Sequence, residues 1–174
     1  TKLFESLRNI IISRNADEGV YRMYGHSDEP RGWSRWIYEQ AGIKSGECIL
    51  DAGCGWGNLW RFNEERLVPD MLVTLVDFHN TYADDLEEYV RDKSQFHFMW
   101  GDLNELDYPG KYDCIFLNHV ILYLENPVET YTRLRSFLNP GGRMITTWGG
   151  LLLAENLMTL LCEHAPEGQK QIKA

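Results

Sequence analysis

Positive charge is scarce in this sequence compared with negative charge. The 174 residues include 17 Lys and Arg against 26 Asp and Glu, which gives a formal net charge of −9 at pH 7. Proteins that bind nucleic acids normally present a basic patch to the phosphate backbone, so this balance argues against a nucleic-acid partner. The hydrophobic fraction of 44% is sufficient for one globular domain with a real core.

Cysteine is also scarce, and long apolar runs are missing. Cys48, Cys54, Cys114 and Cys162 are scattered without a C-x-x-C pair, and the five histidines show no metal-ligand spacing. We therefore predict reduced thiols, no metal site and a cytoplasmic location. The longest leucine run, at 151–153, is too short to span a membrane, and no signal peptide is evident, so we expect no membrane partner.

The most informative segment covers residues 49–59 and spells ILDAGCGWGNL. An apolar run ends in Asp51 and leads directly into Gly53, Gly55 and Gly57, which predicts a buried strand, a tight turn and then a helix. A side chain in such a turn would obstruct either the backbone or a ligand, and the N–H groups of the helix N-terminus face the same crevice. The segment therefore predicts a site for a nucleotide-type cofactor.

The spacing of these glycines separates two classes of cofactor. Dinucleotide oxidoreductases favour G-x-G-x-x-G, whereas this chain has G-x-G-x-G with an acid two residues before the first glycine. The Asp51 carboxylate would repel a pyrophosphate but suits a cationic ligand. An NAD-dependent oxidoreductase is therefore the weakest of the alternatives.

Segments with strand and helix character alternate along the chain. We expect strands at 48–51, 72–77, 96–100, 112–118 and 143–148, and a turn at 139–142. Helices are expected at 1–15, 33–41, 58–66, 82–92, 127–138 and 151–162, the fifth with proline in its first turn. Repeated β–α units predict an α/β fold with a parallel sheet and helices on both faces.

These landmarks together resemble the class I S-adenosylmethionine-dependent methyltransferases. The segment 49–59 is similar to their motif I, Asp77 closes the second strand, and Gly101-Asp102-Leu103 follows the third. Residues 112–124 resemble the family's fourth strand and its continuation, and 134–143 resemble the signature ahead of the fifth. The resemblance covers roughly residues 45–150. It implies a Rossmann-like, doubly wound sheet.

The resemblance also implies an organisation for the whole chain. We expect a single methyltransferase domain over 1–174, with an N-terminal helical lid or substrate segment at 1–44, a cofactor-binding core at 45–150 and a C-terminal helix and tail at 151–174. The family's sheet usually ends in two antiparallel strands, for which the residues after Trp148 leave little room. We therefore expect these strands to be missing from the chain or supplied by another chain.

The resemblance further implies S-adenosylmethionine as the cofactor, with S-adenosylhomocysteine as product. Asp51, Gly53, Gly55 and Gly57 would hold its methionine end, Asp77 the ribose with Phe78 beside it, Asp102 and Leu103 the adenine, and Asn118 the methionine portion again. Considered alone, an Asp at a strand end such as Asp77 more often caps a helix or turn, and its place in register with the glycine loop reverses this preference. Asp102 alone could equally begin an Asp turn.

Two further candidates concern the chemistry and the lid. His119 is the candidate catalytic base because histidine titrates near neutral pH, although it could instead bond to backbone or pack near the cofactor. Tyr21, Tyr24 and Trp33 belong to the N-terminal segment, where aromatic faces would attract a sulfonium. Tyr24 is the one assigned to the cofactor, and the alternative is that all three pack the N-terminal helices.

The expected function is methyl transfer to O, N or C of a small molecule. The Asn/Asp-Pro-Pro-Tyr/Phe motif of amino-methylating DNA and RNA enzymes is absent, and so is the paired-glutamate loop of arginine methyltransferases. An aminopropyltransferase is an alternative, but it should carry an acidic pair where Asn118 and His119 stand. A binding or scaffold subunit without activity is the non-enzymatic alternative. The oligomeric state is left open.

Overall fold

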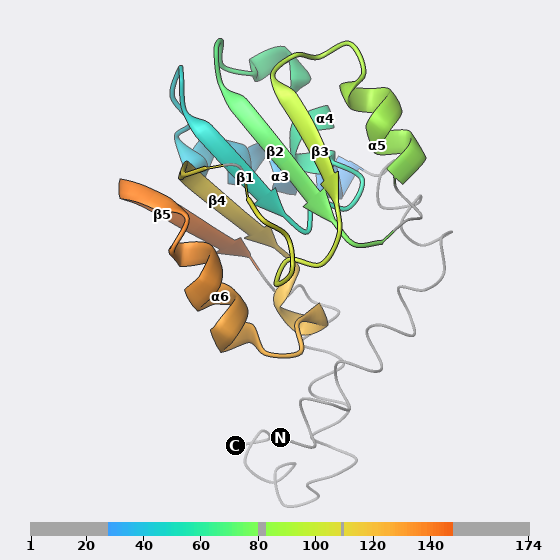
Figure 1. Cartoon of the computed structure of the whole chain (residues 1–174). Coiled ribbons are helices and arrows are strands. Elements are labelled where there is room, and N and C mark those ends of the chain that lie inside the picture. The colour runs from blue at the N-terminus through green and yellow to red at the C-terminus, as the bar shows by residue number, and fades with distance from the viewer. Residues whose placement is uncertain (1–27, 80–82, 109, 148–174) are drawn as a thin grey trace, which may run out of the picture.

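A computed structural model describes residues 28–79, 83–108 and 110–147 of the chain (Figure 1). Five strands form one parallel sheet in the order β3-β2-β1-β4-β5. They are β1 (Cys48–Ala52), β2 (Leu72–Asp77), β3 (Phe96–Trp100), β4 (Tyr112–Asn118) and β5 (Leu138–Thr147). The predicted parallel α/β sheet is confirmed. The helices predicted at 1–15 and 151–162 lie outside the described residues.

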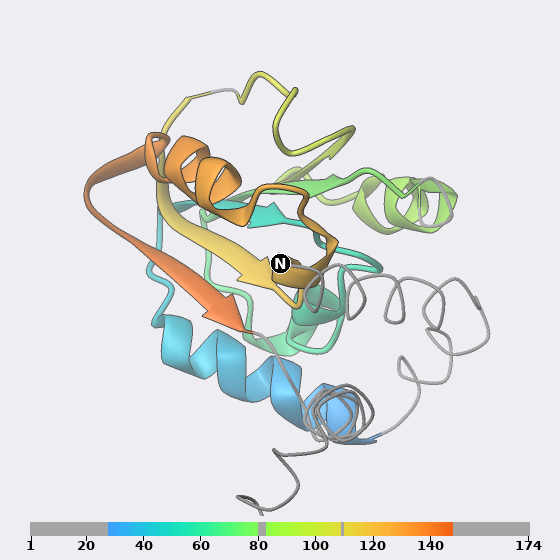
Figure 2. The same cartoon turned by 90° about the horizontal axis from the view of Figure 1, so that it is seen from below.

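Helices cover both faces of this sheet. On one face lie α3 (Asp28–Ala41), α4 (Asn58–Arg61) and α5 (Ala83–Val90), and on the other lies α6 (Pro127–Arg135). Figure 2 shows α3 and α6 on opposite sides of β4 and β5. Two 3-10 turns, η1 (Glu64–Arg66) and η3 (Ile121–Tyr123), follow α4 and β4. The arrangement is the doubly wound one that the β–α repeats predict.

Successive residues of the central strand belong to two separate cores. Ile49 packs with the α3, α4 and α5 side, whereas Leu50 packs with the α6 side, as the alternation of side chains along a strand requires. The first core is centred on Trp60, which is 0% exposed. The Trp60 ring meets Phe96 and Phe116 edge-on, with centroid distances of 5.8 and 5.9 Å. Burial on both faces explains why β1, β2 and β4 are nearly continuous apolar runs.

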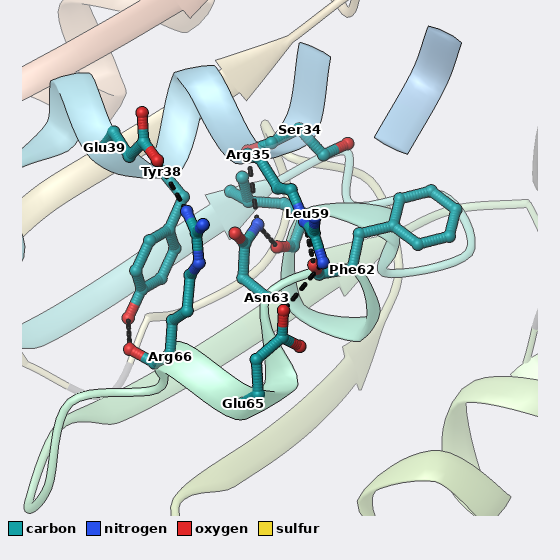
Figure 3. Close-up of polar contacts among 9 residues, drawn as sticks. All are labelled: Ser34, Arg35, Tyr38, Glu39, Leu59, Phe62, Asn63, Glu65 and Arg66. Carbon is teal, nitrogen blue, oxygen red and sulfur yellow. Dashed lines mark hydrogen bonds and ion pairs between the residues drawn. The ribbon is translucent and has the colours of Figure 1, made fainter. Parts of the chain in front are cut away.

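Helix α3 is fastened to the segment that follows α4 (Figure 3). The Tyr38 hydroxyl donates to the Arg66 carbonyl at 3.0 Å. The Arg35 side chain donates to the Phe62 carbonyl at 3.3 Å and pairs with Glu65 at 2.7 Å. These contacts cross from one helix to the next, so α3 fixes the position of α4 on the sheet.

The helix predicted over 58–66 is wrong in its second half. Helix α4 ends at Arg61, and η1 begins only at Glu64. Between them, the Asn63 side chain donates to the carbonyls of Leu59, at 2.7 Å, and Ser34, at 3.2 Å (Figure 3). Asparagine side chains that bond to backbone compete with helical hydrogen bonding, and here the competition ends the helix.

The predicted turn at 139–142 is instead part of β5. Leu138 pairs with Tyr112 and Arg143 pairs with Cys114, so residues 139–142 form a bulge between two paired positions. Gly141 at the bulge has a φ of +81°, a conformation that glycine adopts without steric cost. The sequence correctly marked an irregular backbone here, but the irregularity lies within a strand.

The remaining boundaries differ little from the prediction. Strands β2, β3 and β4 have the predicted limits, and β1 extends one residue further. Helix α3 begins earlier, at Asp28, and α6 ends earlier, at Arg135, because β5 already begins at Leu138. Asn126 caps α6 and exchanges hydrogen bonds with Glu129, while Pro127 occupies the first turn as predicted.

Candidate cofactor-binding site

The predicted site residues within the described ranges gather at one edge of the sheet. In a parallel sheet the carboxyl ends of all strands lie together, and the arrowheads in Figure 1 point to that edge. The glycine loop follows β1 there, Asp77 ends β2, Asp102 follows β3, and Asn118 ends β4. The chain runs outward from β1 to β2 and β3 and then returns to the other side of β1 as β4. The strand order therefore reverses beside β1, and this switch point is where open α/β sheets bind ligands.

The glycine loop is tied to the end of β2. The N–H groups of Gly53 and Cys54 donate to the Val76 carbonyl at 2.8 and 2.9 Å. The Gly55 N–H donates to Oδ2 of Asp77 at 2.7 Å, and the His79 N–H donates to Oδ1 of the same carboxylate at 2.9 Å. Asp77 is 8% exposed. Its carboxylate therefore sits where the loop and the strand end meet, with one lone pair on each oxygen left over by these bonds.

The three loop glycines are required for different reasons. A Cβ on Gly53 would come within 2.4 Å of Val120 Cγ2, and one on Gly57 would come within 3.2 Å of Leu86 Cδ2. A Cβ on Gly55 would meet no described heavy atom within 4 Å, although its φ of +52° is one that other residues rarely adopt. Gly53 and Gly57 thus serve packing, whereas Gly55 borders open space in which a ligand can lie.

Asp51 is the most deeply buried acid of the site, at 2% exposure. Its Oδ2 accepts a hydrogen bond from the Trp60 indole N–H at 2.8 Å. Burial raises the pKa of Asp51 to about 7; the Trp60 bond acts in the opposite direction, and the nearby Asp77 charge adds to the rise. Burial likewise raises the pKa of Asp77, against the backbone bonds from His79 and Gly55. A cation at this edge would favour the ionised form of both acids.

The end of β3 supports the simpler interpretation of Asp102. Its Oδ1 accepts from the Asn104 N–H at 2.7 Å, which forms the Asp turn expected as the alternative. Leu103 is buried, and its carbonyl accepts from the Tyr108 hydroxyl and from Arg133, each at 2.9 Å. These bonds leave the second oxygen of Asp102 for other partners, so the adenine role stays a prediction.

Two exposed aromatic side chains stand beside Asp77. Phe78 is 58% exposed and Trp100, at the end of β3, is 59% exposed. The Trp100 indole N–H donates to the Phe78 carbonyl at 3.0 Å, so the two strand ends are joined there. Phe78 was predicted as a cofactor residue, but Trp100 was not. Its position as the register partner of Asp77 is set by strand pairing, which the sequence does not display.

The end of β4 holds the predicted base. The Asn118 side-chain oxygen accepts from the Thr147 hydroxyl at 3.0 Å, and the His119 N–H donates to the Thr147 carbonyl at 2.8 Å. His119 has a φ of +59°, an uncommon value for a residue other than glycine, and such positions cluster at functional sites. Desolvation lowers the pKa of His119, which favours the neutral imidazole that a base requires. Thr147 was not predicted, because no local pattern marks it as a contact of the site.

Some predicted residues fall elsewhere. Tyr21 and Tyr24 lie outside the described residues, and the Trp33 side chain is not described. Beside η3 and α6, a mainly apolar hollow of about 360 Å³ is lined by Ile121, Pro127, Val128, Tyr131 and Thr132. None of the residues predicted from the sequence lines this hollow.

Neither a metal cluster nor a membrane span is found in the described part of the chain. Among residues 28–79, 83–108 and 110–147, no group of three or more His, Cys, Asp or Glu could hold a metal ion. No helix in the same ranges has the length and apolar character needed to cross a membrane. Cys48, Cys54 and Cys114 are free cysteines.

A doubly wound parallel sheet with a glycine loop after β1 and an acid at the end of β2 defines a Rossmann-like nucleotide-binding domain. Residues 50–144, more than half of the 174-residue chain, match the family model described as a methyltransferase domain. The chain belongs to this family, and specifically to its class I S-adenosylmethionine-dependent type.

Individual proteins agree with this assignment. The malonyl-[acyl-carrier protein] O-methyltransferase of Halalkalibacterium halodurans is 33% identical over 107 residues, covering 58% of this chain and 39% of that protein. The crystal structure of coclaurine N-methyltransferase bound to N-methylheliamine and SAH superimposes with a TM-score of 0.59 at 20% identity, covering 66% of this chain and 34% of the other.

The fold also occurs in a protein named for a different reaction. The crystal structure of the [4+2]-cyclase SpnF has a TM-score of 0.62 and 19% identity, over 71% of this chain and 47% of that one. At such identities the likeness establishes the fold alone. The chain spans less than half the length of each of these three proteins.

Proposed function

We propose that this chain binds S-adenosylmethionine at the carboxyl edge of its sheet and transfers the methyl group to O, N or C of a small molecule. The observation that carries the proposal is the carboxylate of Asp77, held by the Gly55 N–H at 2.7 Å next to the open space over Gly55. A ribose in that space would place two hydroxyls against an acceptor already fixed in position.

The charges of the site fit this cofactor. S-Adenosylmethionine carries a sulfonium and an ammonium group, and the site offers the buried carboxylates of Asp51 and Asp77, whose pKa values are raised by burial. A dinucleotide pyrophosphate would add negative charge to the same place. The N–H groups of Gly53, Cys54 and Gly55 already donate within the chain, so they are less available to a phosphate.

We assign the cofactor residues as follows. The methionine end would be held by Asp51, Gly53, Gly55, Gly57 and Asn118. The ribose would be held by Asp77 with Phe78 beside it, and the adenine by Asp102 and Leu103. Tyr24 would contribute from the N-terminal segment. The cofactor, when bound, supplies an electrophilic methyl group. Because such a transfer depends on alignment, the chain's main contribution is to position and shield its ligands.

His119 is proposed as the base where the acceptor must lose a proton. Its lowered pKa favours the neutral imidazole, in which one ring nitrogen is unprotonated and can act as the base. The backbone at His119 is held by the bond to Thr147, so the ring is anchored at the edge where the cofactor residues lie. Acceptors that react without losing a proton would not need His119.

The relatives leave the acceptor atom open, because one is named as an O-methyltransferase and another as an N-methyltransferase. The net charge of −9 supports a small acceptor rather than a nucleic acid. The free, scattered cysteines support a cytoplasmic location. The single domain organisation over 1–174, with a helical lid at 1–44, remains part of the proposal; residues 28–41 of that segment form α3.

Calorimetric titration of the full chain with S-adenosylmethionine, S-adenosylhomocysteine and NADH tests the cofactor. We expect micromolar binding of the first two and none of the third. Absence of binding by a chain that unfolds cooperatively would overturn the proposal. A positive result is followed by a search for methyl transfer from labelled cofactor to a metabolite mixture.

A further inference from the structure

Trp60 makes two kinds of contact that belong to different parts of the molecule. Its ring is the centre of an aromatic group in which Tyr38, Phe96 and Phe116 all meet it edge-on or nearly so. Its indole N–H points instead to the site and donates to Oδ2 of Asp51 at 2.8 Å. Both partners of this bond are buried, Trp60 at 0% and Asp51 at 2% exposure.

A leucine or phenylalanine could fill this core position without an N–H group. Packing of the core therefore does not require the indole N–H group. In a buried setting, a hydrogen bond to an ionised group is among the stronger interactions, and loss of the donor leaves the acceptor with its full desolvation cost. The position of Trp60 is itself fixed, because α3 is bonded to the segment immediately after α4.

One of the other titratable groups near Asp51 disfavours its ionisation. The charge that does so is the Asp77 carboxylate on β2. Burial raises the pKa values of the Cys54 thiol in the glycine loop and the Cys114 thiol on β4, so both thiols stay neutral and add no charge near Asp51 at neutral pH. His79 acts on Asp77 in the opposite sense. The Trp60 N–H is the contact that favours the ionised form of Asp51 itself.

We propose that Trp60 is a positioning residue of the cofactor site: its indole N–H holds the buried Asp51 carboxylate in place and favours the ionised form that a cationic ligand needs. This inference rests on the proposed function for the identity of that ligand. It also makes a claim about the ligand-free chain, namely that the N–H group acts on the charge of Asp51.

The first experiment measures urea unfolding of the full chain between pH 5 and pH 9 for wild type, Trp60→Phe and Phe96→Leu. Phe96 belongs to the same aromatic group but makes no bond to Asp51. Both variants should lose stability through packing. Only Trp60→Phe should also change the pH dependence of the free energy of unfolding. Its loss of stability should be larger at pH 8 than at pH 5, because the ionised Asp51 carboxylate has lost its donor. A loss independent of pH in both variants would overturn the proposal.

The second experiment measures S-adenosylhomocysteine binding by the same three proteins across this pH range. We expect Trp60→Phe to bind about tenfold or more weakly at pH 7, the range for a lost hydrogen bond to a charged group. The deficit should shrink toward pH 9, and Phe96→Leu should bind like wild type. In an Asp51→Asn background, Trp60→Phe should have no further effect on binding. Equal binding by wild type and Trp60→Phe at every pH would overturn the inference.

The two experiments separate the two proposals. If wild type fails to bind S-adenosylhomocysteine, the proposed function falls and the role assigned to Trp60 in ligand binding falls with it. The unfolding data still decide whether the N–H group governs the charge of Asp51. If wild type binds but the Trp60 variant is unaffected, the proposed function stands and the role of Trp60 is purely structural.

Discussion

The acids at the two edges of the sheet have pKa values shifted in opposite directions. At the amino edge, Glu47 receives two hydrogen bonds from Arg143, at 2.7 and 2.9 Å, and Asp113 receives bonds from the Cys48 N–H and the Asn139 side chain. These bonds hold the pKa values of both acids below their usual range. At the carboxyl edge, burial outweighs the bond that Asp51 receives from Trp60, and the pKa of Asp51 rises to about 7.

The difference separates acids whose role is structural from the acids that we propose to bind the cofactor. At the amino edge, the acids find their hydrogen-bond partners within the chain itself. Arg143 on β5, for example, donates to Glu47 and to the Ala41 carbonyl at the end of α3. The carboxyl edge keeps carboxylates in a setting that costs stability. Such an arrangement is typical of functional sites, where neighbouring groups supplied by the ligand complete the electrostatics.

The largest expected effect is on the glycine that borders open space. Gly55→Val should remove S-adenosylhomocysteine binding beyond detection in calorimetry, because the side chain would fill the ligand's space and the φ of +52° disfavours it. Gly46 is the matched control: it has a φ of +77°, also borders open space, and lies at the amino edge before β1. Gly46→Val should cost stability and leave binding intact. Equal loss of binding in both variants would contradict the proposal that the ligand binds at the carboxyl edge and not at the amino edge.

The next largest effect on binding is expected when Asp77, the acid at the end of β2, is removed. Asp77→Ala should weaken S-adenosylhomocysteine binding about 10- to 100-fold, corresponding to about 1.5–3 kcal/mol for a charged hydrogen bond. Asp113→Ala at the other edge should leave the dissociation constant unchanged, although it removes partners from Cys48 and Asn139. Calorimetry on both variants decides the matter, and wild-type affinity in Asp77→Ala would contradict the ribose assignment.

The pH dependence of stability should differ in sign between the edges. The folded pKa of Asp51, about 7, lies above its unfolded value of 3.8, so the folded chain binds the extra proton between these values. Stability from this group is present at low pH and lost as pH rises toward 7, with a slope of at most about 1.4 kcal/mol per pH unit. In urea unfolding between pH 5 and pH 8, Asp51→Asn should flatten this slope. A variant that keeps the wild-type slope would show that Asp51 does not titrate there.

The smallest effect concerns the amino edge. Glu47→Gln should lower the free energy of unfolding by about 1–2 kcal/mol at pH 7, a moderate value because the Arg143 side chain is 32% exposed. The pKa of Glu47 is lowered, so its stabilisation is present above the unfolded value of 4.5 and lost as pH falls below it. The variant should therefore differ from wild type above pH 4.5 and approach it in acid. Binding of S-adenosylhomocysteine, measured alongside, should be unchanged.

Local patterns in the sequence were enough to predict most of the sheet. The strands β2 and β4 have their predicted limits because each is an apolar run buried on both faces, a pattern that needs no knowledge of distant residues. Strand β3 also has its predicted limits, although it is only partly buried. The two clear errors arose from contacts between distant segments. Asn63 ends a helix by bonding to Ser34, and residues 139–142 become a bulge only by pairing beside β4.

The residues of the candidate site also fall into those that local patterns predict and those that depend on contacts between distant segments. Strand ends in a parallel sheet share an edge, so Asp51, Asp77 and Asn118 could be brought together from the sequence alone. The bond from Trp60 to Asp51 could not, because a tryptophan in a short apolar helix has the pattern of a core residue. Trp100 was missed for a related reason, since its place beside Phe78 depends on the register between β2 and β3.

The close approach of Val120 to Gly53 has a consequence for how the site comes into being. Gly53 follows β1 and Val120 follows β4, so the wall of the glycine loop is completed by a segment that is synthesised much later. The proposed site is therefore complete only once β4 has paired with β1. A ligand of this edge therefore selects the fully folded chain, and its binding will raise the midpoint of thermal unfolding with concentration.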